Sequence, residues 1–333
     1  MWHEGQAMND TSGLTVGAAT RAGRHLEAIC AGLGDGSPLE TAIAHPCDAT
    51  SISAAMEAAR ARLIAPIFVG PAAKVERAAA AAGEDISGFR RIDAPHSDAA
   101  AEAAVALVRA GEAVLLMKGS LHTDEVMRAV LDPVLGLRTK RRISHVYLMD
   151  VLRYPKLLMI TDAAINIAPT LADKRDIAQN AIDLARALGI ARPKLAILSA
   201  VETVNPAIPS TLDAAALCKM ADRGQITGGL LDGPLAFDNA VSKAAARDKG
   251  ILSEVAGDAD ILLVPDLEAG NMLAKQLTFL AGAEAAGIVL GARVPIVLTS
   301  RADSAAARLA SCAVAVRLAR TRIEAQQGVG VSS

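Results

Sequence analysis

The segment that decides the fold is residues 261–308, which read ILLVPDLEAGNMLAKQLTFLAGAEAAGIVLGARVPIVLTSRADSAAAR. Residues 261–264 form a short unbroken apolar run, and such a run predicts a strand buried on both faces. A polar loop follows, and the spacing of leucines after it predicts a helix over residues 272–281. Two further apolar runs, residues 288–290 and 295–298, predict two more buried strands. Strands and helices in this alternation are typical of an α/β protein.

Polar residues follow two of these predicted strands at their carboxyl ends, where α/β proteins bind ligands. The last strand leads into Ser300 and Arg301, and Asp303 and Ser304 come next, where a helix N-cap belongs. An alanine-rich helix is predicted to follow, over residues 305–318. The loop after the first strand carries two acids, a glycine and Asn271. The two strand ends therefore direct carboxylates, a hydroxyl, an amide and a guanidinium to one region.

The length of the chain predicts two domains. It has 333 residues, a size at which one hydrophobic core usually stops growing. Strand-like and helix-like runs alternate from residue 41 onward, which predicts a parallel sheet with right-handed crossovers. The pattern restarts after a basic turn, so residues 137–143 are the expected boundary. Beyond it, residues 145–151 and 157–161 are predicted to be antiparallel neighbours.

The composition excludes several classes of protein. The net charge is −2 with acidic and basic residues interspersed, which leaves no electrostatic footprint for nucleic acid. No apolar run reaches the ~18–20 residues of a membrane span. Residues 1–13 lack the features of a signal peptide and are interpreted as a frayed extension. Four scattered cysteines without a CxxC pair argue against a metal site or a disulfide framework. We therefore expect a soluble cytoplasmic protein.

Several ordered blocks of the sequence resemble one enzyme family. DLEAGNMLAKQL at residues 266–277 and AGAEAAGIVLGARVPIVLTSRADS at residues 281–304 are similar to the carboxy-terminal signature of the phosphate acetyltransferase and phosphate butyryltransferase family. Earlier blocks agree with it, namely MKGSLHTDEVMRAVL, ITDAAINIAPTL, SAVETVNPAIPST and GGLLDGPLAFDNAVS. The TSRADS form makes the butyryl-type members the nearer match. Several blocks in order are far more specific than one short motif.

This resemblance implies a fold and a reaction. The implied fold is like that of isocitrate and isopropylmalate dehydrogenases, with two α/β domains and a cleft between them. The last helix would fold back, so that residues 1–138 plus 300–333 form the first domain and residues 139–299 the second. The implied enzyme is a phosphate acyltransferase that converts acyl-CoA and inorganic phosphate reversibly into acyl phosphate and CoA. The acyl group would be acetyl or butyryl. CoA would be a substrate, no cofactor or metal would be bound, and a homodimer is implied.

Arg301 and Ser300 are the first candidates for catalysis. A planar guanidinium binds phosphate through two parallel hydrogen bonds, which a lysine cannot imitate. The hydroxyl of Ser300 would stabilise the developing oxyanion or contact the phosphate. The alternative is a capping serine beside a surface arginine. Their place at the end of a buried strand, inside a matching family block, favours the functional interpretation.

Asp303 is the third catalytic candidate. Acetyl-type members that this chain resembles carry an aspartate seven positions after the serine, and that position here is Ala307. Asp303 is the nearest acid, and butyryl-type members share the SRAD arrangement. Two interpretations stay open. Asp303 is either a base that acts on the CoA thiol or the N-cap of the following helix, where a carboxylate is less basic.

A second group of candidates follows the strand predicted for residues 113–117. Lys118, Gly119 and Ser120 lie at its exit as candidate substrate-binding residues. Gly119 permits a tight exit from the strand, and the backbone N–H groups of this segment are expected to help hold an anion.

Four more residues are candidate substrate contacts. His122 is expected to make a polar contact. Arg128 matches the family's arginine in this block, and it is either a second phosphate contact or a helix-surface arginine paired with Asp124. Asn271 is expected to orient an amide of the acyl or pantetheine group. Lys275 is expected either to pair with Glu268 or to reach a phosphate.

One dense basic run remains to be explained, and it contains Arg138, Lys140, Arg141 and Arg142. It is either a solvated turn between the domains or a contact for the phosphates of a nucleotide-bearing cofactor. Two other functions also stay open. The first is a non-catalytic acyl-CoA binding protein, suggested by Ala307. The second is a dehydrogenase on the related fold, although no Gly-x-Gly-x-x-Gly follows any predicted strand.

Overall fold

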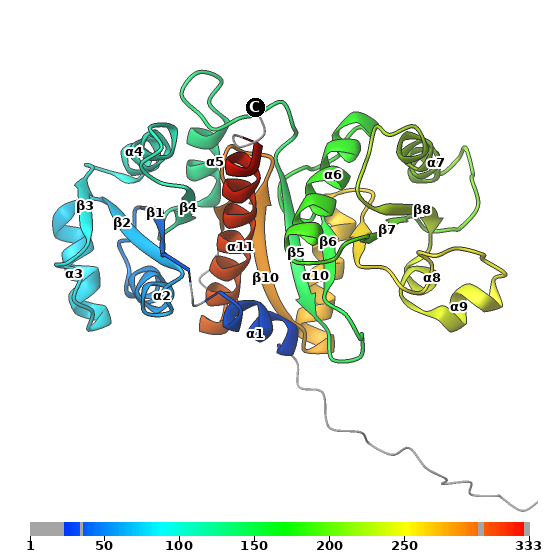
Figure 1. Cartoon of the computed structure of the whole chain (residues 1–333), viewed down its shortest axis with the longest axis horizontal. Helices are drawn as coiled ribbons and strands as arrows, with labels where there is room; N and C mark the ends of the chain where they lie inside the picture. Colours follow the sequence, from blue (N-terminus) through cyan, green and yellow to red (C-terminus); the bar gives the residue numbers. More distant parts are fainter. Residues whose placement is uncertain (1–22, 34–35, 299–302, 330–333) are drawn as a thin grey trace, which may run out of the picture.

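The computed structural model describes residues 23–33, 36–298 and 303–329. Within them the protein is an α/β structure built on one continuous mixed sheet of 11 strands. Figure 1 shows an elongated molecule in which the sheet runs along the long axis, with helices packed around it. The extension expected at residues 1–13 lies outside the described residues.

The first half of the chain supplies one end of the sheet. A short helix, α1 (Arg24–Ala31), precedes the alternation of strand and helix that the sequence predicted. The elements are β1 (Leu39–Ala44), α2 (Ala49–Arg60), β2 (Ile64–Gly70), α3 (Ala72–Ala82), β3 (Arg90–Asp93), α4 (Ser97–Arg109), β4 (Leu115–Lys118) and α5 (Thr123–Leu131). These strands are parallel, in the order β3-β2-β1-β4.

The second half supplies the other end of the sheet. Its elements are β5 (Ser144–Asp150), β6 (Leu158–Thr161), α6 (Leu171–Ala187), β7 (Lys194–Leu198), α7 (Pro209–Asp222), β8 (Leu230–Leu235), α8 (Phe237–Val241), α9 (Lys243–Asp248), β9 (Ile261–Leu263) and α10 (Leu267–Ala281). Strands β6, β9, β7 and β8 are parallel to one another. β5 runs antiparallel to β6, which confirms the prediction for this pair.

Two late strands join these ends of the sheet. β10 (Glu284–Leu290) and β11 (Ile296–Val297) lie between β4 and β5, which gives the order β3-β2-β1-β4-β11-β10-β5-β6-β9-β7-β8. β11 is parallel to β4, but β10 is antiparallel to both β11 and β5. The expectation of a parallel sheet is therefore wrong at the centre. The short connection over residues 291–295 accounts for this, because only antiparallel neighbours can be joined so tightly.

The final helix packs over this central junction. α11 (Ala305–Val329) contacts β10, and it also touches α1, α2 and α6 (Figure 1). Its hydroxyl-bearing Ser311 accepts a hydrogen bond from the backbone N–H of Gly287 on β10, at 3.0 Å. Among the described residues, no helix is both long and apolar enough to span a bilayer.

Apolar residues alternate between the two faces of the sheet and are buried against helices on each. On one face, residues of α2, α6 and α11 pack with Met117, Val146 and Ile288. On the other face, α4 and α5 pack with Leu116, while α10 packs with Ile160. The second face is called the α5/α10 face below, because the candidate residues are found there.

Two elements differ from their predictions in ways that affect the site. The helix expected from residue 272 begins at Leu267, because the carboxylate of Asp266 accepts a hydrogen bond from the backbone N–H of Ala269, at 2.9 Å. Asn271 therefore lies near the start of α10 rather than in a loop. β3 has no counterpart among the predicted strands, because its sequence RRID is charged and largely exposed.

Candidate active site

The exit of β4 is bound tightly to the end of β1. The backbone N–H groups of Gly119 and Ser120 donate hydrogen bonds to the carbonyl oxygens of Ala44 and His45, each at 2.9 Å. The hydroxyl of Ser120 donates to the same His45 carbonyl at 2.8 Å and accepts from the backbone N–H of Cys47 at 3.0 Å. The two N–H groups are thus paired within the protein, which contradicts the expectation that they hold an anion.

Gly119 is required by this close approach. A Cβ at this position would lie 2.5 Å from the carbonyl oxygen of Ala44 and 2.7 Å from two backbone atoms of His45. Backbone atoms cannot move aside as a flexible side chain can. The predicted tight exit is therefore present, and a glycine is what permits it.

We expect Gly119→Ala to lower the free energy of unfolding by about 1–3 kcal/mol, the usual cost of overpacking. Gly88→Ala is the matched control, because a Cβ there meets no atom within 4 Å. Urea unfolding of both variants measures the difference. Equal stabilities would contradict the close approach described here.

The other candidates near β4 have partners on the protein surface or in the backbone. Lys118 Nζ donates to the carbonyl oxygens of Gly119 and Leu121, at 3.3 and 3.1 Å. His122 precedes α5, and its backbone N–H donates to the carboxylate of Glu125 at 2.6 Å. His122 itself is exposed.

Arg128 faces α4. Its guanidinium lies 3.0 Å from the Asp98 carboxylate and 4.0 Å from that of Asp124, and its side chain is 67 % exposed. Asp98 and Arg128 line a cavity of about 670 Å³ between α4 and α5. The surface pair weighed from the sequence is therefore present, and the closer partner is an acid on the neighbouring helix.

The register of the central strands aligns the exit of β4 with β5. One row across β4, β11, β10 and β5 consists of Leu116, Ile296, Val289 and His145. Neighbouring strands are about 4.8 Å apart, so the ends of this row are about 14 Å apart. Lys118 and Tyr147 lie two residues further along their parallel strands and on the same α5/α10 face. A candidate from the first half and a tyrosine from the second thus border one stretch of sheet.

The described part of β11 and the residue after it, Leu298, border this stretch. Leu298 is the last residue before a gap at residues 299–302, and the predicted catalytic residues Ser300 and Arg301 lie outside the described residues. Because β11 is parallel to β4, with Val297 paired to Met117, Leu298 leaves the sheet beside Lys118. The described chain resumes at Asp303.

Asp303 is not the N-cap of α11. That position belongs to Ser304, whose hydroxyl accepts a hydrogen bond from the backbone N–H of Ala307 at 3.1 Å. The backbone carbonyl of Asp303 accepts from the guanidinium of Arg308 at 2.5 Å. The structure thus removes the capping interpretation of Asp303.

Asn271 approaches the same face from α10. Its side-chain amide donates to the carbonyl oxygen of Ala163 at 3.2 Å, which joins α10 to the segment after β6. Gly270 permits this contact, because a Cβ there would lie 2.9 Å from the carbonyl oxygen of Asp162. Lys275 lies one turn later, is exposed, and forms no ion pair within the described parts of the chain.

His145 and Tyr147 are two residues of this face that the sequence did not single out. Their ring centroids are 4.3 Å apart in an edge-on arrangement. Gly287 on β10 leaves room for the imidazole, since a Cβ there would lie 2.9 Å from His145 Nε2. Burial raises the pKa of Tyr147, and the charges of Asp303 and Asp162 raise it further. Both carboxylates therefore act on one hydroxyl.

His145 is held neutral. Burial lowers its pKa to about 4, while the charge of Asp162 acts in the opposite direction. Its Nδ1 has no hydrogen-bond partner among the described residues. An imidazole with a depressed pKa contributes stability that is present above the unfolded pKa of about 6.5 and is lost as the pH falls through the window from there to 4.

We expect the free energy of unfolding to fall by about 2 kcal/mol more in the wild type than in His145→Phe between pH 7 and pH 5. The reason is that His145 binds a proton in the unfolded wild type but not in the folded protein over this pH range. Carboxylates contribute to both proteins, so the difference isolates the imidazole. Chemical unfolding at the two pH values measures it, and identical pH dependences would contradict the neutral His145.

The predicted convergence of the two strand ends is wrong. β9 runs in the opposite direction to β11, with β10, β5 and β6 between them, so the chain leaves these two strands at opposite edges of the sheet. Some candidate residues nevertheless share one face of the sheet. Lys118, Asp303 and Asn271 border the α5/α10 face around β11, β10 and β5. Arg128 faces away toward α4 and His122 is exposed. A signal for the residues that were missed did exist. Polar side chains at positions 145 and 147 recur with the two-residue period of a strand, which places them on one face.

The described fold is that of a phosphotransacylase. A solved branched-chain phosphotransacylase from Enterococcus faecalis V583 is similar to it with a TM-score of 0.74 and 31 % identity, over 84 % of this chain and 99 % of that one. A family model described as phosphate acetyl/butaryl transferase matches residues 96–316. This chain belongs to that family, which confirms the resemblance found in the sequence.

Two curated relatives show how the identity is distributed. A phosphate acetyltransferase from Rhizobium meliloti is 64 % identical over 290 residues, which are 87 % of this chain and 92 % of the relative. A phosphate butyryltransferase from Clostridium acetobutylicum is 42 % identical over 280 residues, or 84 % of this chain and 93 % of the relative. The acetyl-type relative is the more similar of these two, whereas the TSRADS motif pointed to the butyryl type.

Proposed function

We propose that this enzyme transfers a short-chain acyl group between CoA and inorganic phosphate, so that acyl-CoA and phosphate give acyl phosphate and CoA. The observation that carries the proposal is the high identity, over most of the chain, to a relative named as a phosphate acetyltransferase. CoA is then a substrate, and no bound cofactor is needed. Acetyl is the acyl group that this relative supports, and butyryl is the second.

The bond changes set the tasks of the site. A phosphate oxygen attacks the thioester carbonyl carbon, the carbon–sulfur bond breaks, and the CoA sulfur leaves and takes up a proton. Arg301 would hold the phosphate through both arms of its guanidinium. Ser300 would donate a hydrogen bond to the oxyanion that forms at the carbonyl. Holding both substrates in one place would itself supply a large part of the rate.

The described residues have supporting roles in this proposal. Lys118 borders the position where the chain leaves β11, so its charge would attract phosphate. Asn271 would orient an amide of the acyl-CoA from the opposite side. Asp303, which directly precedes the N-cap Ser304, would exchange the proton with the CoA sulfur. Gly119 and Ser120 would shape the exit of β4 rather than bind substrate through their N–H groups.

We further propose two α/β domains with a cleft between them, as in isocitrate and isopropylmalate dehydrogenases. Residues 1–138 plus 300–333 would form the first domain and residues 139–299 the second. The division is supported by the sheet, in which β1–β4 occupy one end and β5–β9 the other. Contacts of α11 with α1 and α2 support its return to the first domain, and α11 also contacts β10 and α6 of the second.

A homodimer in the cytoplasm completes the proposal. The outer side of α10 exposes Met272, Phe279 and Leu280, of which 59 %, 81 % and 85 % are accessible. Apolar side chains gathered on one helix are typical of a surface that a second subunit covers.

The test is the release of free CoA thiol from acetyl-CoA and butyryl-CoA, with and without phosphate. We expect release that depends on phosphate, with kcat/KM higher for acetyl-CoA. Binding of acyl-CoA by calorimetry without turnover would instead establish a non-catalytic binding protein. Reduction of NAD by a 2-hydroxy acid, in the absence of thiol release, would establish a dehydrogenase.

A further inference from the structure

The basic run of residues 138–142 lines a cavity that the proposed chemistry does not yet use. The cavity has a volume of about 510 Å³ and lies between the end of α5, this run, the segment after β6 and the first turns of α6. Its cationic wall is Arg138, Lys140, Arg141 and Arg142. The run therefore lines a cavity as well as being exposed. We call this cavity the basic pocket.

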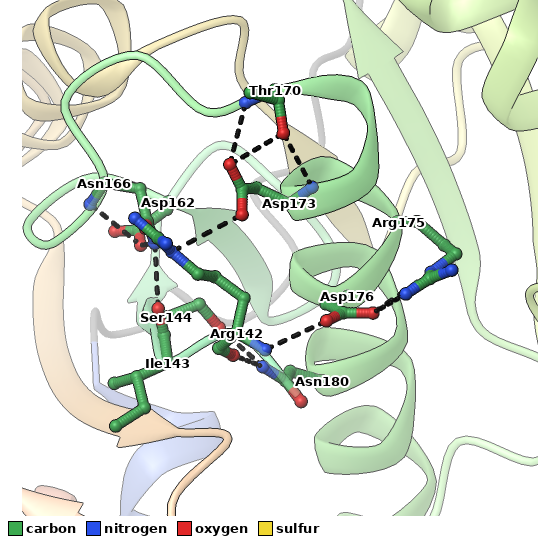
Figure 2. A network of polar contacts seen from close by, with 10 residues as sticks. All are labelled: Arg142, Ile143, Ser144, Asp162, Asn166, Thr170, Asp173, Arg175, Asp176 and Asn180. Carbon is green, nitrogen blue, oxygen red and sulfur yellow. Dashed lines mark hydrogen bonds and ion pairs between the residues drawn. The ribbon is translucent and has the colours of Figure 1, made fainter. Parts of the chain in front are cut away.

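The protein fixes one side of the basic pocket rigidly. Figure 2 shows Arg142 held by several partners at once. Its Nε donates to Asn166 Oδ1 at 2.6 Å and lies 3.6 Å from the Asp173 carboxylate. Its backbone N–H donates to Asp176 at 2.9 Å, and its carbonyl accepts from Asn180 at 2.9 Å. A wall held this way is preorganised, which reduces the entropy cost of binding a ligand.

The acids near the pocket do not neutralise all of its cations. Asp173 lies beside the guanidinium of Arg142, Asp176 pairs with Arg175, and Arg141 pairs with Asp183. Arg138 and Lys140, by contrast, form no ion pair within the described ranges of the chain, and both are exposed. These two cations are therefore available to a ligand without breaking a contact in the protein.

Apolar side chains complete the lining, and they narrow the chemistry of the ligand. Leu131, Ile143 and Ile165 line the pocket beside the cations. An inorganic anion needs only the charges, whereas a nucleotide uses both kinds of wall, its base against apolar atoms and its phosphates against Arg and Lys. The volume of the pocket also exceeds what a single phosphate fills.

We propose that the basic pocket binds a nucleotide that carries two or more phosphates. That chemistry is shared by the 3′-phosphorylated ADP end of CoA and by free nucleotides, and the first source rests on the proposed function. The pocket adjoins the candidate active site through one segment. Asn166 donates to Asp162 at 2.5 Å, and the next residue, Ala163, accepts from Asn271.

The experiment measures binding of adenosine 3′,5′-bisphosphate to the full chain by calorimetry. The test variant is R138Q/K140Q, and the control is R192Q/K219Q, which removes the same charge from exposed residues elsewhere. We expect the test variant to bind at least about tenfold more weakly, a difference of about 1.4 kcal/mol, and the control to bind like the wild type. Thermal unfolding checks that both variants are folded, and K140Q alone serves if the double variant is not.

Competition identifies the source of the nucleotide. If CoA displaces adenosine 3′,5′-bisphosphate and R138Q/K140Q raises KM for CoA with kcat unchanged, the pocket holds the end of CoA. If both ligands bind at once, the pocket takes a free nucleotide. No binding to the wild type, or equal binding to both double variants, overturns the proposal. Thiol release by the wild type is measured separately, so the proposed function can stand when this inference fails.

Discussion

Arg301→Lys is expected to reduce kcat for phosphate-dependent CoA release by about 10²–10³-fold, the range seen when one preorganised donor to a transition state is lost. Lysine keeps the positive charge but not the planar pair of donors, so phosphate loses its fixed orientation toward the thioester. The effect should appear in kcat more than in KM, because an ammonium still attracts phosphate. Arg192→Lys, at an exposed arginine, is the matched control and should behave like the wild type.

The measurement is steady-state thiol release at saturating acyl-CoA and phosphate. Thermal unfolding of Arg301→Lys should match the wild type, which separates a catalytic defect from a folding defect. A wild-type kcat in Arg301→Lys would contradict the proposed role of Arg301. The proposed activity of the enzyme would not be affected by that result.

Asn166→Asp is expected to produce the largest loss of stability, about 3 kcal/mol or more at pH 7, because it leaves a buried charge uncompensated. Asn166 and Asp162 are each only 2 % exposed, and the amide nitrogen of Asn166 lies 2.5 Å from Asp162 Oδ2. The substitution would place two carboxylates in contact and leave the Ile143 carbonyl, now 2.9 Å from that nitrogen, without its donor. A stronger pair with Arg142 offsets little, since the Arg142 side chain is 53 % exposed.

Asn166→Ala is the control for this effect, because it removes the same hydrogen bonds without adding charge. Two carboxyls in one site raise the pKa of one of them, so the folded Asp variant takes up a proton as the pH falls. The loss of unfolding free energy relative to the wild type should therefore be smaller at pH 5 than at pH 7 for Asn166→Asp. For Asn166→Ala the loss should be the same at both pH values. Equal losses at both pH values in the two variants would contradict the contact with Asp162.

The parts of the fold that the sequence predicted are those with local signals. The apolar runs before Lys118 and Ser300 do form strands, β4 and β11, but their pairing as parallel neighbours was not predicted. The sequence instead predicted that the ends of β9 and β11 converge, and this failed because strand direction and order in the sheet depend on pairings distant in sequence. The antiparallel β10 was not predicted in that orientation, because a buried apolar run reads the same in either direction. The start of α10 was displaced because Asp266 was assigned to a loop, although an aspartate ahead of an apolar helix is also an N-cap signal.

The site shows where sequence reasoning ends. The N–H groups of Gly119 and Ser120 donate to carbonyl oxygens of residues 44 and 45, which are far away in sequence. These partners depend on the approach of β1 and could not be predicted from the local sequence. The buried His145 depends on Gly287 across the sheet, a pairing that only the register of β5 and β10 reveals. The alternation at His145 and Tyr147, by contrast, was readable in advance. The pKa shifts of these two residues follow from their burial, which could not be predicted from the sequence.

The most direct test of the central claim is a structure of the protein with CoA and phosphate bound. We expect the CoA sulfur to lie on the α5/α10 face, where β4 and β11 end, between Lys118 on one side and Asn271 on the other. We also expect the phosphate to contact Arg301. A CoA sulfur bound on the opposite face beside α11, with residues 300–303 remote from it, would contradict the account.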